Sequence, residues 1–270
     1  MRYKQILVLG ANGMLGQMTV YFFRRVGYKV IPFNEKFTTS TISLLANQIN
    51  DYEASIIINC IGKIPQKSTN EIDLVTANTL LPLELARKLK NDHLLIHPST
   101  DCVFSGYNNI FYPKNYEVNP KDFYGMSKAW GEFILTSRPN TIITRVSLIG
   151  PDKNSEKGLL QWFLSQQSGS TISGFTNHYW NGITTYEWCK QIESLLNTFV
   201  PMDRKFIQLG FYNGCSKFEL LSCFKEVYKH DVNIVPMSTG QIVDRRLEPE
   251  LISPDIQQQL IEMKTEYKYE

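Results

Sequence analysis

The feature that most constrains the fold is a glycine-rich turn between an apolar strand and a helix at the start of the chain. Residues 5–9 form a continuous apolar run, which is typical of a central parallel strand covered on both faces. The sequence GANGMLG follows at residues 10–16, and residues 17–28 have a helical pattern closed by Gly27. Glycines let the backbone come close to a pyrophosphate, and a helix N-terminus offers free N–H groups and a positive dipole. This unit therefore predicts a dinucleotide phosphate-binding site.

The end of the second predicted strand bears on the choice of cofactor. This strand covers residues 29–33, and Asn34, Glu35 and Lys36 follow it. In such units the residue at this strand end meets the adenosine ribose, where an acid favours NAD and a cation favours the 2′-phosphate of NADP. Asn34 is neither, Glu35 suits NAD and Lys36 suits NADP, although both charges are also compatible with simple solvent exposure. We expect NADP to be preferred over NAD.

Strands and helices keep alternating over the first 150 residues. Further buried-type strands are predicted at residues 55–59, 94–98 and 141–146, and helices at residues 73–89 and around Tyr124. This alternation indicates a parallel, doubly wound sheet with its ligand at the carboxyl ends of the strands. We expect an α/β fold: a Rossmann-type doubly wound parallel sheet with a smaller C-terminal substrate-binding region. The expected domains are an NAD(P)-binding domain at residues 1–150 and a mainly substrate-binding region at residues 151–270, of which about 184–230 packs back on the sheet.

Two positions beside the strand ends have more than one interpretation. Gly62 follows the strand at residues 55–59, where it either lets the chain pass beside a cofactor or forms an ordinary turn. Asn78 lies inside the predicted helix at residues 73–89. A mid-helix asparagine usually faces solvent, but one that faces the sheet can fix a neighbouring strand end.

Tyr124 and Lys128 are a candidate acid–base pair. Positions i and i+4 share one face of a helix, so the phenol hydroxyl and the ammonium group can converge on one point. A cation about 4 Å away at an effective dielectric of ~20 favours the phenolate by ~4 kcal/mol, roughly three pK units. We therefore expect Lys128 to lower the pKa of Tyr124 into the range where proton exchange is efficient near neutral pH. On its own, the pair is also compatible with an amphipathic helix whose lysine is solvated.

Composition argues against several classes of function. A net charge of +2 with 20% charged residues indicates no special attraction to nucleic acid or to a membrane surface. The apolar segments are too short or too interrupted to span a bilayer, and the N-terminal apolar run is too short for a signal peptide. The five cysteines are odd in number and contain no CxxC pair. We therefore expect no disulfide framework, no metal site and a location in the reducing cytosol.

The second half of the chain begins with an uncharged polar stretch. Residues 158–186 contain no Asp, Glu, Lys or Arg, but many Ser, Thr, Asn, Gln, Trp and Tyr residues. Such a stretch can surround a polyhydroxylated ligand with hydrogen-bonding groups and aromatic rings, or it can be an irregular packed segment whose polar groups are satisfied. After it we predict helices at residues 185–199, 217–228 and 254–263, and strands at residues 205–209 and 231–236.

Three motifs in this order resemble those of the extended short-chain dehydrogenase/reductases: GANGMLG at residues 10–16, STDCVFSG at residues 99–106 and YGMSKAWGE at residues 124–132. The chain is most similar to the dTDP-4-dehydrorhamnose reductase branch, over essentially its full length, including NHYWNGITT and DRRL nearer the end. The resemblance implies NAD(P)H-dependent reduction of the 4-keto group of a nucleotide-linked 4-keto-6-deoxyhexose, in the biosynthesis of deoxysugar and polysaccharide precursors. Its implied partner is the nucleotide-sugar substrate, and a homodimer is the assembly considered.

The resemblance also implies roles for individual residues. Tyr124 gives its proton to the substrate carbonyl oxygen, Lys128 lowers the pKa of that tyrosine and holds the nicotinamide ribose, and Thr100 orients the carbonyl. Cofactor binding is implied for Gly10, Asn12, Gly13, Met14, Leu15, Gly16, Asn34, Cys60, Ile61, Gly62, Ser99, Tyr124 and Lys128. Substrate binding is implied for Thr100, Cys102, Val103, Phe104, Asn177, Trp180 and Arg245. For Arg245 and its neighbour Arg246, a solvated turn is equally compatible with the sequence.

Cys102 departs from the pattern of this branch, which commonly has an aromatic residue after the Thr-Asp pair. Sugar-nucleotide 4,6-dehydratases of the wider family carry a glutamate there, so Cys102 argues against dehydration. GDP-fucose synthases carry a cysteine at the comparable place and use it with a histidine. Cys102 with His178 therefore leaves open a bifunctional epimerase/4-reductase or a 4-epimerase, and inert packing of a buried cysteine is the other interpretation. A third alternative, a non-catalytic regulatory subunit, would usually lack the tyrosine or the lysine.

Overall fold

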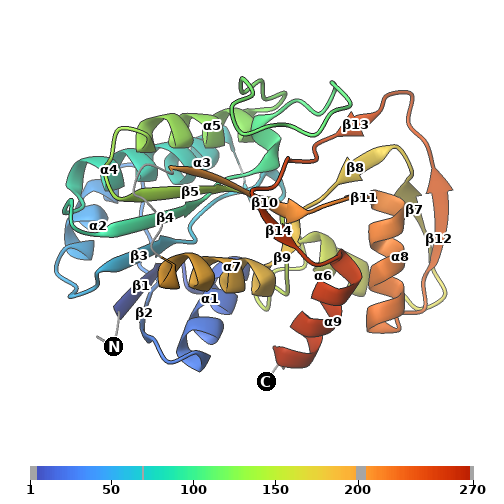
Figure 1. The fold of residues 1–270 in the computed structure, drawn as a ribbon, viewed down its shortest axis with the longest axis horizontal. Helices are drawn as coiled ribbons and strands as arrows, with labels where there is room; N and C mark the ends of the chain where they lie inside the picture. The colour runs from blue at the N-terminus through green and yellow to red at the C-terminus, as the bar shows by residue number, and fades with distance from the viewer. Residues whose placement is uncertain (1–4, 69, 199–204, 268–270) are drawn as a thin grey trace.

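The computed structural model of the protein describes residues 5–68, 70–198 and 205–267. Figure 1 shows a large sheet with helices on both faces, and beside it a smaller unit of short strands and helices. Within the described residues the large sheet has seven strands in the order β14-β10-β5-β4-β3-β1-β2, and every neighbouring pair is parallel. The strands are β1 Gln5–Leu9, β2 Lys29–Phe33, β3 Ile56–Asn59, β4 Leu94–Pro98, β5 Thr141–Arg145, β10 Phe206–Phe211 and β14 Leu251–Ser253. The predicted doubly wound α/β fold is confirmed.

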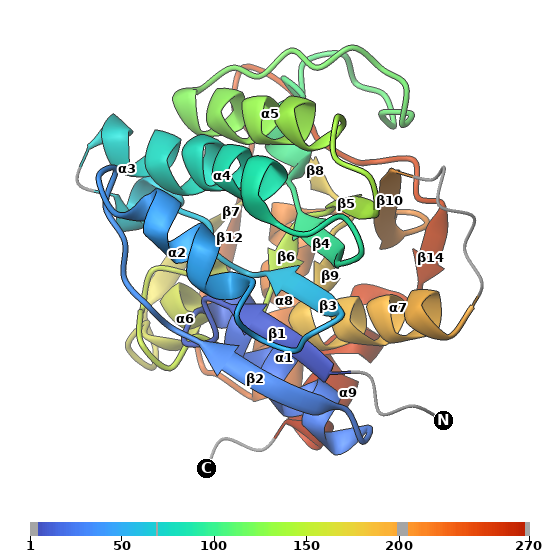
Figure 2. The same cartoon turned by 90° about the vertical axis from the view of Figure 1, so that its left-hand side faces the viewer.

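The alternation of apolar side chains along β1 explains why helices cover both faces of this sheet. Ile6 and Val8 pack into one core with residues of α1 and α7, while Leu7 and Leu9 pack into a second core with residues of α2 and α4. Figure 2 shows α2, α4 and α5 on one side of the sheet and α1 and α7 on the other. These helices are α1 Met14–Arg25, α2 Ile42–Ile49, α4 Leu81–Lys88, α5 Phe123–Leu135 and α7 Thr185–Asn197. Each such buried side chain contributes roughly 1.5–3 kcal/mol of hydrophobic stabilisation.

The helix predicted over residues 73–89 is interrupted by a wider turn. It consists of α3 Glu71–Val75, a π-helical turn Thr76–Leu80 and then α4. Pro82 accounts for the interruption, because it has no backbone N–H to donate to the carbonyl of Asn78 four residues earlier. The proline within the helical pattern was the sequence signal for this irregularity. The turn leaves the Asn78 carbonyl directed at Gly131 of α5.

Two glycines bring α5 into direct contact with the backbone of its neighbours. A Cβ atom placed on Gly125 would lie 2.2 Å from the carbonyl oxygen of Cys102, and one placed on Gly131 would lie 2.3 Å from the carbonyl oxygen of Asn78. Between β5 and α5, the guanidinium group of Arg145 forms a buried ion pair with the Glu132 carboxylate at 2.8 Å. The motif YGMSKAWGE therefore contains, besides its candidate acid–base pair, the residues that fix α5 against the sheet.

The smaller unit is built from the second half of the chain. Its strands are β7 Thr171–Phe175, β8 His178–Trp180, β11 Cys215–Ser216, β12 Asn233–Met237 and β13 Val243–Asp244, and its helices are α6 Leu159–Leu164, α8 Lys217–Tyr228 and α9 Ile256–Glu266. Strand β7 pairs with β12, and β8 lies between β11 and β13. The uncharged polar stretch thus contains three strands, β7, β8 and β9 Ile183–Thr184, that its composition did not reveal. Part of the second half of the chain belongs to the large sheet: β10 and β14 are two of its strands, and α7 packs on one of its faces. A short parallel pair of strands, β6 Leu148–Ile149 and β9 Ile183–Thr184, forms beside them.

Replacement of Gly131 by alanine tests the contact between α5 and the π-helical turn. Alanine is the better helix former by ~1 kcal/mol, so intrinsic propensity alone predicts stabilisation. The clash with the Asn78 carbonyl predicts instead a loss of about 2 kcal/mol in the free energy of unfolding, measured by urea denaturation. The matched control is Gly158→Ala, where the nearest atom to the new methyl group is 4.0 Å away. A stability equal to or above that of the wild type in Gly131→Ala would contradict the close approach.

Candidate functional site

A cavity of about 400 Å³ opens at the carboxyl ends of β1, β3, β4 and β5. Strand order reverses between β1 and β3, the place where doubly wound sheets bind their ligands. The cavity is lined by eleven of the residues that the sequence singled out: Gly13, Met14, Leu15, Cys60, Ile61, Gly62, Ser99, Thr100, Cys102, Tyr124 and Lys128. The structure thus brings together three motifs that lie far apart in the sequence.

The glycine-rich turn forms one wall of this cavity. Gly10 has a φ of +71°, and a Cβ atom on Gly16 would lie 2.1 Å from the Gly10 carbonyl oxygen, so the turn closes this tightly only with glycine at both positions. The N-cap of α1 is Gly13, which has no side chain to accept a hydrogen bond from the first N–H groups of the helix. These donors at the cavity wall suit the anionic pyrophosphate of a dinucleotide.

Asn78 fixes the segment after β3, as one interpretation of the sequence expected. Its side-chain oxygen accepts a hydrogen bond from the Lys63 N–H at 3.0 Å, and its amide nitrogen donates to the Lys63 carbonyl at 2.9 Å and to the Ser127 hydroxyl at 3.0 Å. Because Ser127 lies within α5, one buried amide ties the loop that contains Gly62 to the helix that carries Tyr124. This link sets the width of the cavity.

Lys128 is held by the carboxyl end of β4. Its ammonium group donates a 2.7 Å hydrogen bond to the Pro98 carbonyl, and the residue is only 6% exposed. Burial lowers the pKa of Lys128 to about 8, and the nearby Glu132 carboxylate opposes this shift. The ammonium group therefore loses its proton close to neutral pH rather than near pH 10.

Tyr124 corrects one expectation. We expected Lys128 to lower the pKa of Tyr124, but burial raises that pKa, and the Cys102 thiol and the Asp101 carboxylate raise it further. A hydrogen bond with the Thr100 side chain lowers it only in part. The physical reason is that Tyr124 has lost much of its hydration while two acidic groups lie nearby. Tyr124 is therefore a protonated donor at neutral pH.

Thr100 and Ser99 complete this end of the cavity. The Thr100 hydroxyl donates to the Asp101 carboxylate at 3.0 Å and accepts a hydrogen bond from the Cys102 N–H at 3.2 Å. The Ser99 hydroxyl is buried and has no hydrogen-bond partner among the described residues. A buried hydroxyl without a partner is costly unless a ligand satisfies it. Together with the uncapped helix α1, this observation fits a dinucleotide lying across the turn.

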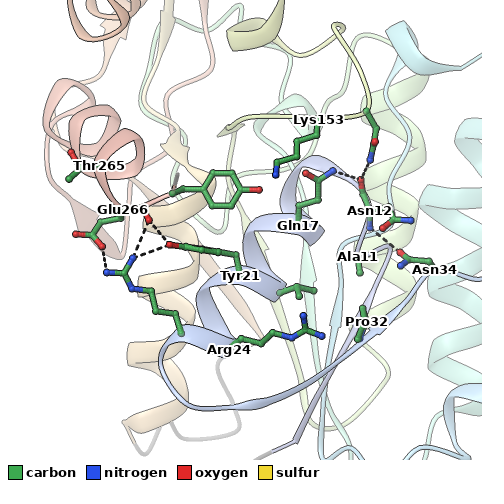
Figure 3. Close-up of a pocket in the computed structure, with 14 residues that line it drawn as sticks. Ala11, Asn12, Gln17, Tyr21, Arg24, Pro32, Asn34, Lys153, Thr265 and Glu266 are labelled. Carbon is green, nitrogen blue, oxygen red and sulfur yellow. Dashed lines mark hydrogen bonds and ion pairs between the residues drawn. The ribbon is translucent and has the colours of Figure 1, made fainter. Parts of the chain in front are cut away.

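Asn12 and Asn34 lie outside this cavity. The N–H of Asn12 donates to the side-chain oxygen of Asn34 at 2.9 Å, and both residues line a second groove between α1, the loop at residues 153–154 and the end of α9. Figure 3 shows Asn34 beside the turn and Arg24 on the other side of this groove, directed toward Pro32. Asn34 thus uses its side-chain oxygen within the protein. Glu35 and Lys36 are both exposed.

Four of the residues expected to bind substrate do not face the cavity. Val103 and Phe104 are fully buried, and Phe104 stacks on Tyr112 with 4.4 Å between ring centroids. Trp180 is 2% exposed and belongs to the core of the protein. The side chain of Asn177 is tied to the backbone of residues 239 and 241. Apolar and amide side chains satisfied in this way offer no surface to a ligand, because packing within the smaller unit already uses them.

Cys102 and His178 have different hydrogen-bond partners, and the Cys102 thiol donates to the Asp101 carboxylate at 3.7 Å. Burial, with a smaller contribution from the Asp101 carboxylate, raises the pKa of Cys102 to about 12. The Nε2 atom of His178 lies 2.9 Å from the Thr239 hydroxyl, and its ring stacks on Phe175. A thiol with this pKa is a poor base at neutral pH. The geometry therefore gives no support to epimerisation.

Sequence reasoning missed two cations near the cavity. Lys217, the first residue of α8, lies with its ammonium group 5.1 Å from the centroid of the Trp180 ring and interacts electrostatically with Asp101 and Cys102. Lys67 lines the cavity and pairs with the buried carboxylate of Asp152 across its mouth. The capping box formed by Ser216 and Glu219 was a readable signal for the start of α8. No sequence pattern showed that this helix begins beside Cys102.

Two further properties bear on the class of protein. Within residues 5–68, 70–198 and 205–267, no three His, Cys, Asp or Glu side chains are grouped so that they would hold a metal ion. In the same ranges, no helix combines the length and the apolar character needed to cross a membrane.

Comparison with known proteins gives relatives that are mostly named as reductases, and one, from Danio rerio, that is named "Methionine adenosyltransferase 2 subunit beta". The chain is 28% identical over 190 residues to the "Probable low-salt glycan biosynthesis reductase Agl14" of Haloferax volcanii, covering 63% of each chain. It is 29% identical over 150 residues to the "dTDP-4-dehydrorhamnose reductase" of Aggregatibacter actinomycetemcomitans, covering 53% of this chain and 51% of the relative. These alignments therefore span between half and two thirds of the relatives' lengths.

A solved structure matches over nearly the whole chain. It is a dTDP-4-dehydrorhamnose reductase from Bacillus anthracis in complex with NADP, with a TM-score of 0.83, 20% identity and coverage of 98% of this chain and 99% of that chain. At this identity the likeness concerns the fold. The family described as "RmlD substrate binding domain" matches residues 4–170, which is more than half of the sequence. The chain therefore belongs to this family.

Proposed function

We propose that this protein is an NAD(P)H-dependent reductase of the 4-keto group of a nucleotide-linked 4-keto-6-deoxyhexose. The observation that carries the proposal is that Thr100, Tyr124 and Lys128 line one cavity, which is suited to a dinucleotide. The names of the two curated relatives, both reductases, support the same chemistry.

The proposed reaction adds a hydride to the carbonyl carbon and a proton to its oxygen. A reduced nicotinamide dinucleotide supplies the hydride when it is bound. Tyr124 donates the proton, because its raised pKa keeps the phenol protonated at neutral pH. The Thr100 hydroxyl, which donates to the Asp101 carboxylate in this structure, turns its proton to the substrate carbonyl oxygen and orients it. The Lys128 ammonium group favours the tyrosinate that is left, which then recovers a proton from solvent.

NADPH is the cofactor that we propose as preferred, with NADH as the alternative. Asn34 stands at the end of β2 and uses its side-chain oxygen on the Asn12 N–H, so its amide nitrogen remains as a donor toward the ribose. An aspartate or glutamate at this position would repel a 2′-phosphate. The described part of the second groove contains one carboxylate, Glu266, and that group is paired with Arg25. These features tolerate the additional phosphate.

The setting that we propose is the synthesis of deoxysugar or polysaccharide precursors in a reducing, cytoplasmic compartment. All five cysteines are free thiols.

A homodimer also remains part of the proposal, because Met126, Trp130 and Phe133 project at helical spacing from α5 and Phe133 is 79% exposed. A second copy packed on α5 would remove this apolar surface from water. Light scattering would measure the mass of the assembly.

Replacement of Tyr124 by phenylalanine tests the proton donor. The change removes one oxygen and leaves the ring packing in place. We expect kcat for reduction of a dTDP- or UDP-linked 4-keto-6-deoxyhexose to fall by roughly 10²- to 10⁴-fold, which is the usual rate contribution of a general acid. Binding of NADPH, followed by nicotinamide fluorescence, should be nearly unchanged. The control is Tyr212→Phe, because Tyr212 is 70% exposed. Reduction at the wild-type rate by Tyr124→Phe would refute the assignment.

The pKa of Lys128 predicts a pH dependence. Because this pKa is lowered to about 8, the ammonium charge is present below that pH and is lost as pH rises through it. We expect kcat/KM, which reports groups of the free enzyme, to be constant near neutral pH and to fall above about pH 8. Tyr124 does not account for this fall, because its pKa lies above the ordinary value of about 10. A profile that stays flat to about pH 10, the range of an ordinary lysine, would contradict the buried setting.

A further inference from the structure

The segment that joins β6 to α6 runs along the glycine-rich turn. This segment, residues 150–158, is called the strap below. The side-chain amide of Asn154 donates a 2.9 Å hydrogen bond to the Asn12 carbonyl. A Cβ atom placed on Gly158 would lie 4.0 Å from the Met14 sulfur, which is ordinary van der Waals contact. The strap therefore touches the turn at two points.

The strap and the turn together form the border between the two hollows of the site. The cavity is lined by residues 13–15 of the turn and by residues 150, 157 and 158 of the strap. The second groove is lined by residues 11–12 of the turn and by residues 153–154 of the strap, and Figure 3 shows Lys153 directed into it. A dinucleotide whose pyrophosphate lies at the start of α1 has one nucleotide on each side of that point. If it reaches from the cavity to Asn34, it crosses this border.

An ion pair fastens the strap to the opposite lip of the cavity. The Lys67 ammonium group pairs with the Asp152 carboxylate, whose side chain is 2% exposed. The other carboxylate oxygen accepts a 3.1 Å hydrogen bond from the Asn154 N–H, so the same side chain also shapes the strap. Lys67 ends the 3₁₀ turn Pro65–Lys67, which follows β3. Opening this pair leaves a buried charge without its partner, which favours the closed arrangement.

The two sides of the ion pair differ in how firmly they are held. On the Lys67 side, Asn78 binds both backbone groups of Lys63 and ties that loop to α5. On the other side, the residues of the hydrophobic core stop at Ile149 and resume at Leu159, and the middle of the strap is exposed. A segment with exposed backbone and few buried apolar contacts opens at a low cost in free energy. The strap is therefore the side that moves when the pair breaks.

We propose that the strap is a gate for the cofactor: it opens when the Lys67–Asp152 pair breaks, admits the dinucleotide and closes behind it. This inference rests on the cofactor of the proposed function and holds for any substrate. The pair is closed both before the dinucleotide enters and after it is bound, so breaking it costs the same free energy on entry and on exit. Lys67 and Asp152 thus set how fast the cofactor is exchanged, and not how tightly it is held.

The rates of NADPH binding test this assignment without catalysis. Stopped-flow fluorescence of the full chain would give the association and dissociation rate constants for the wild type, Lys67→Gln and Asp152→Asn. Asparagine keeps the shape of the side chain and an acceptor for the Asn154 N–H, but it removes the charge. We expect both rate constants to rise by roughly tenfold in each variant, with a dissociation constant within about twofold of the wild type. The double variant should match the single ones, because one interaction is lost in all three.

The matched control is Lys63→Gln, which removes a positive charge from the same loop. Lys63 is exposed and forms no ion pair among the residues that the structure describes. Neither rate constant should rise in this variant. Midpoints of urea denaturation show whether all four variants are folded.

The outcomes separate this inference from the proposed function. A rise in the dissociation rate constant alone would overturn the inference, because it means that the pair grips the cofactor and does not gate its passage. Unchanged rate constants in both single variants would overturn it as well. Failure of the wild type to bind NADPH or NADH would overturn the inference and the proposed function together. Faster exchange at constant affinity supports the gate, and does so even where no keto sugar is reduced and the proposed reductase activity fails.

Discussion

The arrangement of the site depends on the direct contact of α5 with the backbone around it. Gly125 lets this helix meet the Cys102 carbonyl, and Gly131 lets it meet the Asn78 carbonyl. Because Tyr124 directly precedes the first contact and Lys128 lies between the two, their positions relative to Thr100 follow from backbone packing rather than from side-chain adjustment. The Asn78 amide adds the loop after β3 to the same rigid assembly. A helix carrying alanine at either glycine would have to move outward, and its acid–base pair would move with it.

Burial, rather than the neighbouring lysine, controls the electrostatics of the acid–base pair. The Lys128 ammonium group donates a hydrogen bond to the Pro98 carbonyl, whereas Cys102 and Asp101 act on the pKa of Tyr124. The charge of Lys128 therefore affects the pKa of Tyr124 less than their helical spacing suggests. The result is a phenol that keeps its proton and an ammonium group that can lose its own near pH 8. This combination suits a site that gives a proton to a carbonyl oxygen. It does not suit a site that removes a proton from carbon, which agrees with the raised pKa of Cys102.

The sequence predicted the large sheet well, because each of its central strands is an apolar run followed by a turn or helix signal. Residues 5–9, 29–33 and 94–98 are strands as predicted, and the three motifs at the strand ends meet in one cavity. It predicted the smaller unit poorly, since β7 has five residues with a glycine among them and β8 has three, which is too short for a clear alternation of polar and apolar residues. The family resemblance implied substrate binding for Val103, Phe104 and Trp180. Tertiary packing, which local sequence does not encode, buries them instead. The same reason explains why Lys217, remote in sequence from every motif, was overlooked.

The most direct test of the central claim follows the transferred hydrogen. The purified chain would be mixed with a dTDP-linked 4-keto-6-deoxyhexose and NADPH that carries deuterium on the reactive carbon of the nicotinamide, and the product would be examined by NMR and mass spectrometry. The account predicts one deuterium at C4 of the sugar and, in a parallel reaction in D₂O with ordinary NADPH, no solvent deuterium introduced by the enzyme at C3 or C5. Enzyme-dependent exchange at C3 or C5 without oxidation of the cofactor would contradict it.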